Sequence, residues 1–153
     1  MILVSIVPKY IIKKIFPLDG LSNVDVSGDG SPDHVQMVGY NVMLPISVSE
    51  MNSWNLRLEE AGSFSIDGQC CDPAKFVAYY EGKEYTMENF YEAVDLVIPV
   101  GARAKVLYPW PGGLAVGLHV IRVEYSFQDF AGEVEVTREI TEDRWCLPFS
   151  PTF

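Results

Sequence analysis

The chain has 153 residues, a length that suits one domain, and 48% of them are hydrophobic, which is enough to bury a core. Its net charge of −10, with 11 basic residues and no long basic run, argues against a nucleic acid partner, because phosphate binding needs clustered Lys and Arg. Cys70 and Cys71 are adjacent in a set of three cysteines, which argues against a disulfide framework and favours a reducing compartment.

The apolar start of the chain predicts neither a signal peptide nor a membrane anchor. Pro8 and Lys9 interrupt the apolar run, and no small-residue cleavage site follows it. Nowhere does the chain reach the ~18 consecutive apolar residues of a membrane span. We therefore expect a cytoplasmic protein that spans no membrane.

Alternation of apolar and polar residues dominates the chain and predicts strands. From Val38 to Val48 every second residue is apolar, and Pro45 predicts an edge or a break in this strand. Arg138 is the exception on the apolar face of the last predicted strand. The same period of two predicts further strands over residues 54–58, 76–80, 102–106, 121–127 and 134–140.

Turn residues separate these strands. Asp67-Gly68 and Glu81-Gly82 each predict a hairpin, and Pro111-Gly112-Gly113 predicts a sharp corner before the strand that begins near Gly117. One segment, residues 86–94, predicts a short helix, with Thr86 as its N-cap and Asn89 at the position of a capping-box Glu.

Short strands at ~10-residue spacing predict an all-β fold, an antiparallel β-sandwich with one short helix. We expect one such domain over residues 1–153. It ends in an extended tail, about residues 141–153, that contains aromatic residues and Pro148 and Pro151.

Neither of the two histidines lies in a recognisable catalytic motif. His34 precedes a strand near an acidic loop, and His119 is assigned to the polar face of the strand that follows the corner. A general base needs an orienting partner and a perturbed environment. The sequence identifies neither, so a surface or interface histidine is the default interpretation, with a catalytic base as the alternative.

The acidic loop superficially resembles a calcium site, with Asp25, Asp29 and Asp33 in sequence. Position 12 of such a loop is Gln36 instead of Glu, and a proline lies inside it. The cysteines lack C-x-x-C spacing, and the glycines of residues 112–117 precede a strand rather than a helix that could hold a phosphate. We therefore expect a solvated turn, and no metal or cofactor in this chain.

Aromatic residues gather in or near proline-rich segments: Trp110 at the corner, and Trp145 and Phe149 in the tail. Apolar side chains in an extended tail are stable only when another surface shields them from water. Either this domain's own sandwich or a second protein chain can provide it.

Two blocks of the sequence resemble one family. The first, IDGQCCDPAKFVAYYEGKEYTMENFYEAVD, begins at Ile66 and holds two strands, an EGKEYT hairpin and the short helix. The second, PGGLAVGLHVIRVEYSF, holds Pro-Gly-Gly-Leu, then Gly117, His119 and a strand that ends at Phe127. In this order they resemble the small β subunits of bacterial C-glycoside deglycosidases, also called C-deglycosylation enzymes.

The resemblance implies a hetero-oligomer. The larger α subunit of the family is similar to sugar-phosphate isomerases: it has a TIM barrel, a divalent metal of the Mn or Mg class, and the catalytic histidine. The implied substrate is a C-glycoside, such as a flavonoid C-glucoside, already oxidised to the 3-keto sugar by a separate oxidoreductase. The keto group acidifies the neighbouring C–H, a base removes that proton, and the aglycone carbon leaves in an elimination.

In such a complex the β-sandwich subunit is not expected to be catalytic, and it stabilises the α subunit. Trp110, His119, Trp145 and Phe149 are then the candidates for the subunit interface or the substrate mouth. The simpler interpretation of the corner is that it determines the fold.

Two other functions stay open. The chain could be a stand-alone carbohydrate-binding module whose platform is Trp110, Tyr79 and Tyr80, because aromatic faces stack on sugar C–H groups. It could also be a small enzyme with its own site at His34 or His119.

Overall fold

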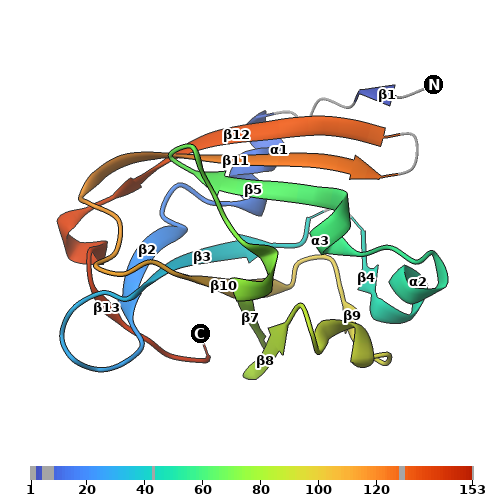
Figure 1. Cartoon of the computed structure of the whole chain (residues 1–153), viewed down its shortest axis with the longest axis horizontal. Coiled ribbons are helices and arrows are strands. Elements are labelled where there is room, and N and C mark those ends of the chain that lie inside the picture. Colours follow the sequence, from blue (N-terminus) through green and yellow to red (C-terminus); the bar gives the residue numbers. More distant parts are fainter. Residues whose placement is uncertain (1–2, 5–8, 43, 128–129, 153) are drawn as a thin grey trace.

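Two sheets packed face to face make up most of the fold (Figure 1). The computed structural model describes residues 3–4, 9–42, 44–127 and 130–152. In these residues one sheet has five strands in the order β1-β12-β11-β5-β6, and the other has six in the order β13-β2-β3-β10-β7-β8. Every pairing is antiparallel except β1 with β12 and β13 with β2, so the predicted all-β, mainly antiparallel sandwich is confirmed.

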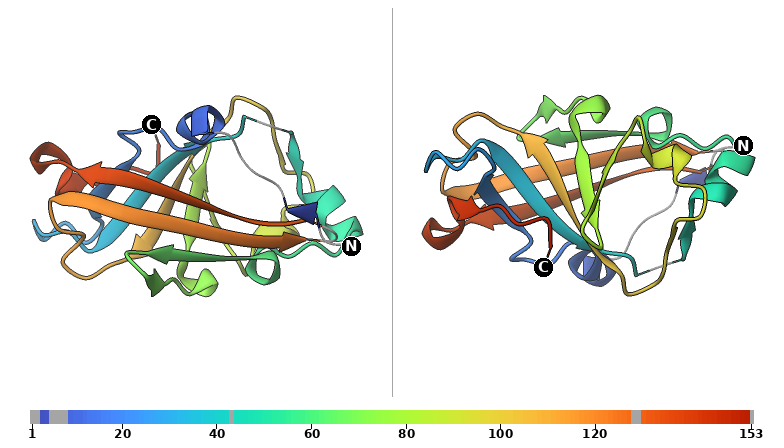
Figure 2. Two further views of the ribbon diagram at one scale, coloured as in Figure 1. Left: turned by 90° about the horizontal axis from the view of Figure 1, so that it is seen from above. Right: turned by 90° about the horizontal axis from the view of Figure 1, so that it is seen from below.

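The five-stranded sheet consists of β1 (Leu3–Val4), β5 (Gly62–Ile66), β6 (Gln69–Cys70), β11 (Gly117–Phe127) and β12 (Phe130–Ile140). The six-stranded sheet consists of β2 (Leu21–Asp25), β3 (His34–Tyr40), β7 (Val77–Tyr80), β8 (Lys83–Thr86), β10 (Arg103–Pro109) and β13 (Leu147–Pro148). A separate ribbon pairs β4 (Ile46–Ser47) with β9 (Val97–Ile98). The strands of the two large sheets cross at an angle, and the ribbon lies at one end of the sandwich (Figure 2).

The strands predicted over residues 76–80, 102–106, 121–127 and 134–140 are confirmed as parts of β7, β10, β11 and β12. Both predicted hairpin turns are present. The φ angles are 51° and 82° at Asp67-Gly68, and 51° and 77° at Glu81-Gly82. Positive φ at both central residues is the signature of the type I′ turn, which matches the twist of the flanking strands.

Two predicted strands need correction. The strand expected over residues 38–48 ends at Tyr40, and Pro45 lies in the break before β4. The strand expected over residues 54–58 is instead the connection between α2 (Val48–Ser53) and α3 (Leu58–Ala61). The hydroxyl of Ser47 accepts a hydrogen bond from the Glu50 amide at 3.3 Å and so starts α2. Ser47 and Glu50 have the spacing of a capping box, a local signal that outweighs the alternation.

The expectation of one short helix is also wrong. Besides α2 and α3 there is α1 (Lys9–Ile15), and the segment predicted as the helix contains only the 3₁₀ turn η2 (Phe90–Glu92). The predicted cap itself is present: the Thr86 amide donates to Asn89 Oδ1 at 2.7 Å, and the Asn89 amide donates to Thr86 Oγ1 at 3.2 Å. Two further 3₁₀ turns are η1 (Pro73–Lys75) and η3 (Glu142–Arg144). None of the described helices has the length and apolar character needed to cross a bilayer.

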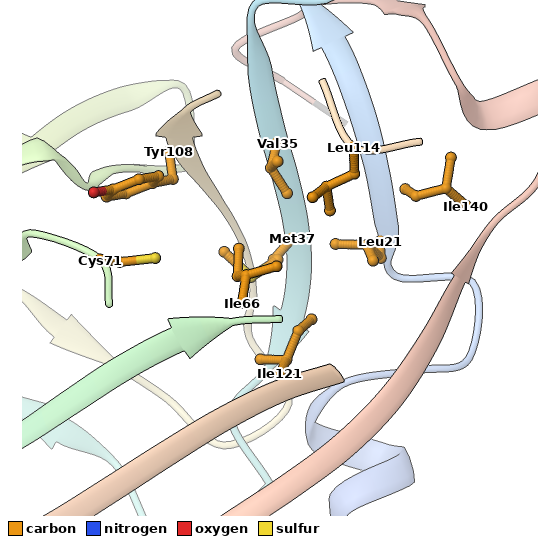
Figure 3. Packing of buried hydrophobic residues seen from close by; sticks show 9 residues of the cluster. All are labelled: Leu21, Val35, Met37, Ile66, Cys71, Tyr108, Leu114, Ile121 and Ile140. Carbon is orange, nitrogen blue, oxygen red and sulfur yellow. The ribbon is translucent and has the colours of Figure 1, made fainter. Parts of the chain in front are cut away.

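The core fills the space between the two sheets, where the inward side chains of both meet (Figure 3). Leu114 lies in it although it belongs to no strand. The buried cluster consists of Leu21, Val35, Met37, Ile66, Cys71, Tyr108, Leu114, Ile121 and Ile140.

The corner between β10 and β11 carries Leu114 into this core. The Gly113 amide donates to Trp110 O at 2.8 Å, which closes a turn with Pro111 and Gly112 at its centre. Gly112 has φ +80°, as the third position of a type II turn requires. The fully buried Asn23 side chain then pairs with both backbone groups of Leu114, with Nδ2 donating to Leu114 O at 2.7 Å and Oδ1 accepting from Leu114 N at 2.8 Å.

The corner yields a stability prediction. In Gly113→Ala the new Cβ would lie 2.7 Å from Asn23 Cγ, at a φ of +70°, and we expect a loss of about 3 kcal/mol of unfolding free energy. Gly112→Ala is the matched control, because its φ is +80° but no atom lies within 4 Å of its Cβ. It should lose only about 1 kcal/mol. Urea denaturation measures both, and equal losses would contradict the role given to Asn23.

Candidate functional site

His119 lies on β11 with both ring nitrogens engaged. Nδ1 is 2.6 Å from Asp67 Oδ2 and Nε2 is 2.6 Å from the carbonyl oxygen of Ala115. Both oxygens are acceptors, so only the doubly protonated ring makes both bonds at once, and the neutral ring keeps one of them. The residue is 8% exposed. This geometry positions His119 as a structural donor rather than as a base facing a substrate.

The assignment of His119 to the polar face of its strand is wrong. His119 and Ile121 lie on the same, inward side of β11, and both are buried. The other Asp67 oxygen accepts from the Val120 amide at 2.8 Å. Asp67 therefore fastens the turn of the β5–β6 hairpin to β11, with His119 as its second contact.

His34 has a simpler environment. Its Nδ1 is 2.7 Å from Asp33 Oδ1, and the carboxylate of Asp33 also accepts from the amides of Val26 and Ser27. Partial burial acts to raise the pKa of Asp33, but the bonds from His34 and these two amides outweigh it and hold that pKa well below its usual value. The Asp33 carboxylate thus holds its own loop through hydrogen bonds to the backbone, and His34 is bonded to the same carboxylate.

The other carboxylates of the acidic loop are likewise committed to the backbone. Asp25 accepts from the amides of Gly28 and Gly30, and Asp29 accepts from the amide of Ser31. Within the described ranges, no group of three or more His, Cys, Asp or Glu side chains is arranged to hold a metal ion. The loop has the contacts of a series of Asx turns.

Trp110 is half-buried against the core, with its ring centroid 6.4 Å from that of Tyr108. Its amide donates to Asp33 O at 2.9 Å, so the corner also touches the acidic loop. Trp110 is therefore placed by the fold, as the simpler interpretation of the corner requires.

The tail returns over its own domain. β13 pairs with β2, and the Phe149 ring packs on Tyr79 with centroids 5.0 Å apart. Lys105 Nζ donates to the carbonyl oxygens of Ser150 and Thr152. Of the two covers that the sequence left open for the tail, the domain's own six-stranded sheet is the one observed. Trp145 keeps 40% of its surface exposed.

The platform proposed for a carbohydrate-binding module does not form. Tyr79 and Tyr80 are consecutive in β7 and point to opposite faces of the sheet. Phe149 covers Tyr79, and Tyr80 is buried. The four candidates Trp110, His119, Trp145 and Phe149 are likewise held by different neighbours and form no common cluster in the described contacts.

A group of exposed apolar side chains lies elsewhere, on α2 and the segments around the β4–β9 ribbon. These elements lie at one end of the sandwich (Figure 2). A groove of about 790 Å³ runs between them; we call it the end groove. Trp54 is 59% exposed and Leu44 is 73% exposed. The apolar residues that line the end groove include Leu44, Ile46, Trp54, Leu58, Phe90 and Val97.

A network around Tyr91 connects elements that border the end groove. The Tyr91 hydroxyl accepts from the Leu58 amide and donates to Glu59 Oε2, each at 2.7 Å. Asn52 Nδ2 donates to Tyr91 O at 3.0 Å, and the Arg57 guanidinium lies 4.2 Å from the Tyr91 ring centroid. Burial, followed by the bond to Glu59, raises the pKa of Tyr91 to about 12. The network joins α2, α3 and η2, so the groove has fixed walls.

Sequence reasoning missed the end groove, although two signals mark it. The residues around Pro45 and Pro99 are mainly apolar, yet a proline cannot lie in the middle of a sheet. Apolar residues next to such prolines are therefore not expected in the interior strands of either large sheet, and their side chains are left outside the core between the sheets. The structure places Ile46 and Val97 in the small ribbon and Leu44 just before it, and all three remain exposed.

A second apolar cavity, of about 300 Å³, lies between the two large sheets and includes Phe16, Phe64 and Phe76 in its lining. It shares Phe64 and Phe76 with a neighbouring cavity that reaches Leu58. Leu58 also lines the end groove. Apolar surface therefore continues from the interior of the sandwich to its exposed end.

Comparison with known proteins leaves the family of the chain open. No protein-family model matches the sequence, and no curated protein matches it. The resemblance to C-glycoside deglycosidase β subunits therefore stays a hypothesis carried by residues 66–127.

The Asp67–His119 contact predicts a pH dependence of stability. Partial burial acts to raise the pKa of Asp67, but the bonds from His119 and Val120 outweigh it and lower that pKa. A carboxyl whose folded pKa is lowered stabilises the fold above its unfolded pKa of about 4, and this contribution is lost as the pH falls through the folded pKa.

We expect Asp67→Asn to cost about 1 kcal/mol at pH 7, since the Asp67 side chain is 41% exposed, and to cost progressively less as the pH falls below the unfolded pKa of about 4. A double-mutant cycle with His119→Gln, followed by urea denaturation between pH 3 and 7, isolates the pair. A coupling energy that does not change with pH would refute this role of the carboxylate.

Proposed function

We propose that the chain is the small, noncatalytic β subunit of a cytoplasmic C-glycoside deglycosidase. Such a complex cleaves the C–C bond between sugar and aglycone in 3-keto C-glycosides. The sequence resemblance over residues 66–127 suggests the family. The observation that carries the proposal is the end groove, because an apolar surface of this kind on a folded domain marks a site of protein association.

The state of the histidines supports a noncatalytic role. Both His119 ring nitrogens lie 2.6 Å from protein acceptors, and His34 is bonded to a carboxylate that anchors its loop. In the proposed complex the divalent metal and the base would belong to the α subunit. The base would take the proton next to the keto group, that C–H electron pair would form the new double bond, and the pair of the breaking C–C bond would leave with the aglycone, whose carbon takes up a proton in its place. This chain stabilises the α subunit and borders its substrate mouth.

Co-expression with the TIM-barrel α subunit encoded beside the chain tests the proposal. We expect the two proteins to elute together in size-exclusion chromatography and to cleave a 3-keto C-glucoside in the presence of Mn²⁺ only when both are present. A monomeric chain that neither binds the α subunit nor affects its activity would refute the proposal.

The histidines provide a second test in the same complex. We expect His34→Gln and His119→Gln to leave kcat within about threefold of wild type, because a lost general base costs 10²–10⁴-fold. His119→Gln should also lower the melting temperature of the chain, since it removes the contact to Asp67. A loss of kcat beyond a hundredfold in an intact complex would instead support the interpretation as a small enzyme.

A further inference from the structure

The two chain segments that wall the end groove carry exposed charge of one sign. In residues 44–61 and 86–100 the acidic residues are all exposed, whereas the single basic residue, Arg57, is half-buried against Tyr91. Arg57 also donates to Asn52 Oδ1 and to Leu56 O, so its guanidinium is directed inward. The acidic residues of these two segments, which we call the rim, are Glu50, Glu59, Glu60, Glu88, Glu92 and Asp95, and Glu50 lines the groove itself.

Exposed apolar side chains are concentrated in the same two segments as the acidic residues. Half of the exposed large apolar side chains in the described residues fall in these two segments: Leu44, Ile46, Trp54, Leu58, Val94, Val97 and Val100. An apolar centre with a charged, solvent-exposed rim is the anatomy of a protein-binding surface. The Tyr91 network already connects α2, α3 and η2 in the free chain, so these elements need less ordering on association.

We propose that the end groove docks the catalytic α subunit, through an apolar patch of that subunit bordered by Lys and Arg. This inference rests on the proposed function. It adds which face of the chain makes the contact and what chemistry the partner presents. We take Trp54 as the anchor, because it is the largest exposed apolar side chain that lines the groove and exposed tryptophans typically dominate binding energy.

The charge of the rim selects this occupant over a second copy of the chain. Two copies that met through their end grooves in a twofold contact would bring two acidic rims together, and each chain carries a net charge of −10. A partner whose apolar patch is bordered by Lys and Arg would instead be attracted electrostatically to the acidic rim. Association with it should also weaken as salt screens the rim.

The strongest competing surface is the outer face of β11, where Leu118 is 72% exposed beside Val120. That face is interrupted by Arg122, which forms ion pairs with Glu124 and Glu133. It therefore lacks both a continuous apolar centre and a rim of one charge. Leu118 serves as the control for an equally exposed apolar side chain outside the groove.

The test measures the Kd of the chain for the purified α subunit by biolayer interferometry, with variants whose fold is checked by circular dichroism. We expect Trp54→Ser to raise Kd about thirtyfold or more and Leu118→Ser to leave it within threefold. The double charge reversal Glu50→Lys/Glu60→Lys should raise Kd at least tenfold and weaken its salt dependence. Glu139→Lys/Glu142→Lys changes the net charge equally, outside the groove, and should do neither.

The outcomes separate this inference from the proposed function. If the wild-type chain binds the α subunit and the groove variants bind equally well, the docking face is wrong and the proposed function stands. If the wild-type chain does not bind the α subunit, both are wrong. A homodimer of the free chain that Trp54→Ser dissociates would overturn the inference in favour of a second copy.

Discussion

The structure depends on one buried amide. The chain passes from the six-stranded sheet to the five-stranded sheet at the corner after β10, and there Leu114 enters the core without a neighbouring strand. A buried peptide group without partners costs about 1–3 kcal/mol. Asn23 supplies both partners from a single side chain, as a strand neighbour would. The missing side chain of Gly113 leaves the space that this amide occupies. This crossing, one of several between the sheets, therefore rests on a local complementarity of Asn and Gly.

Buried polar side chains fasten the remaining loose segments to the sheets. Arg138 on β12 donates to the carbonyl oxygens of Phe16 and Pro17, just beyond α1. Lys105 on β10 donates hydrogen bonds to carbonyl oxygens of the tail. Burial lowers the pKa of both residues, and the carbonyl bonds offset part of that cost. With His119 at the hairpin turn, these residues explain why polar side chains interrupt otherwise apolar strand faces: each fixes a segment that has few strand contacts of its own.

Much of the sandwich could be predicted because its signals are local. Alternation of apolar and polar residues identified β7, β10, β11 and β12. The Asp-Gly and Glu-Gly pairs identified both hairpins, whose central residues have positive φ. The errors came from competing local signals, such as the cap at Ser47 that starts α2. The role of His119 was not predictable, because its partner Asp67 is 52 residues away and only the pairing of β5 with β11 brings them together. The end groove was missed for the same reason: its two walls, residues 44–58 and 90–98, are separate in sequence.

The distribution of chemistry over the molecule favours an associating role. The side chains that could act on a substrate, His34, His119 and Asp67, are bonded within the fold, whereas the large apolar side chains gathered at the end groove are exposed. Exposed apolar surface favours self-association, yet an acidic rim opposes contact between two identical grooves. In the proposed complex the same charge would oppose contact between copies of the chain and favour a basic partner. Specificity would then arise from repulsion of the wrong partner as much as from attraction of the right one, and the acidic composition of the chain would serve its binding as well as its solubility.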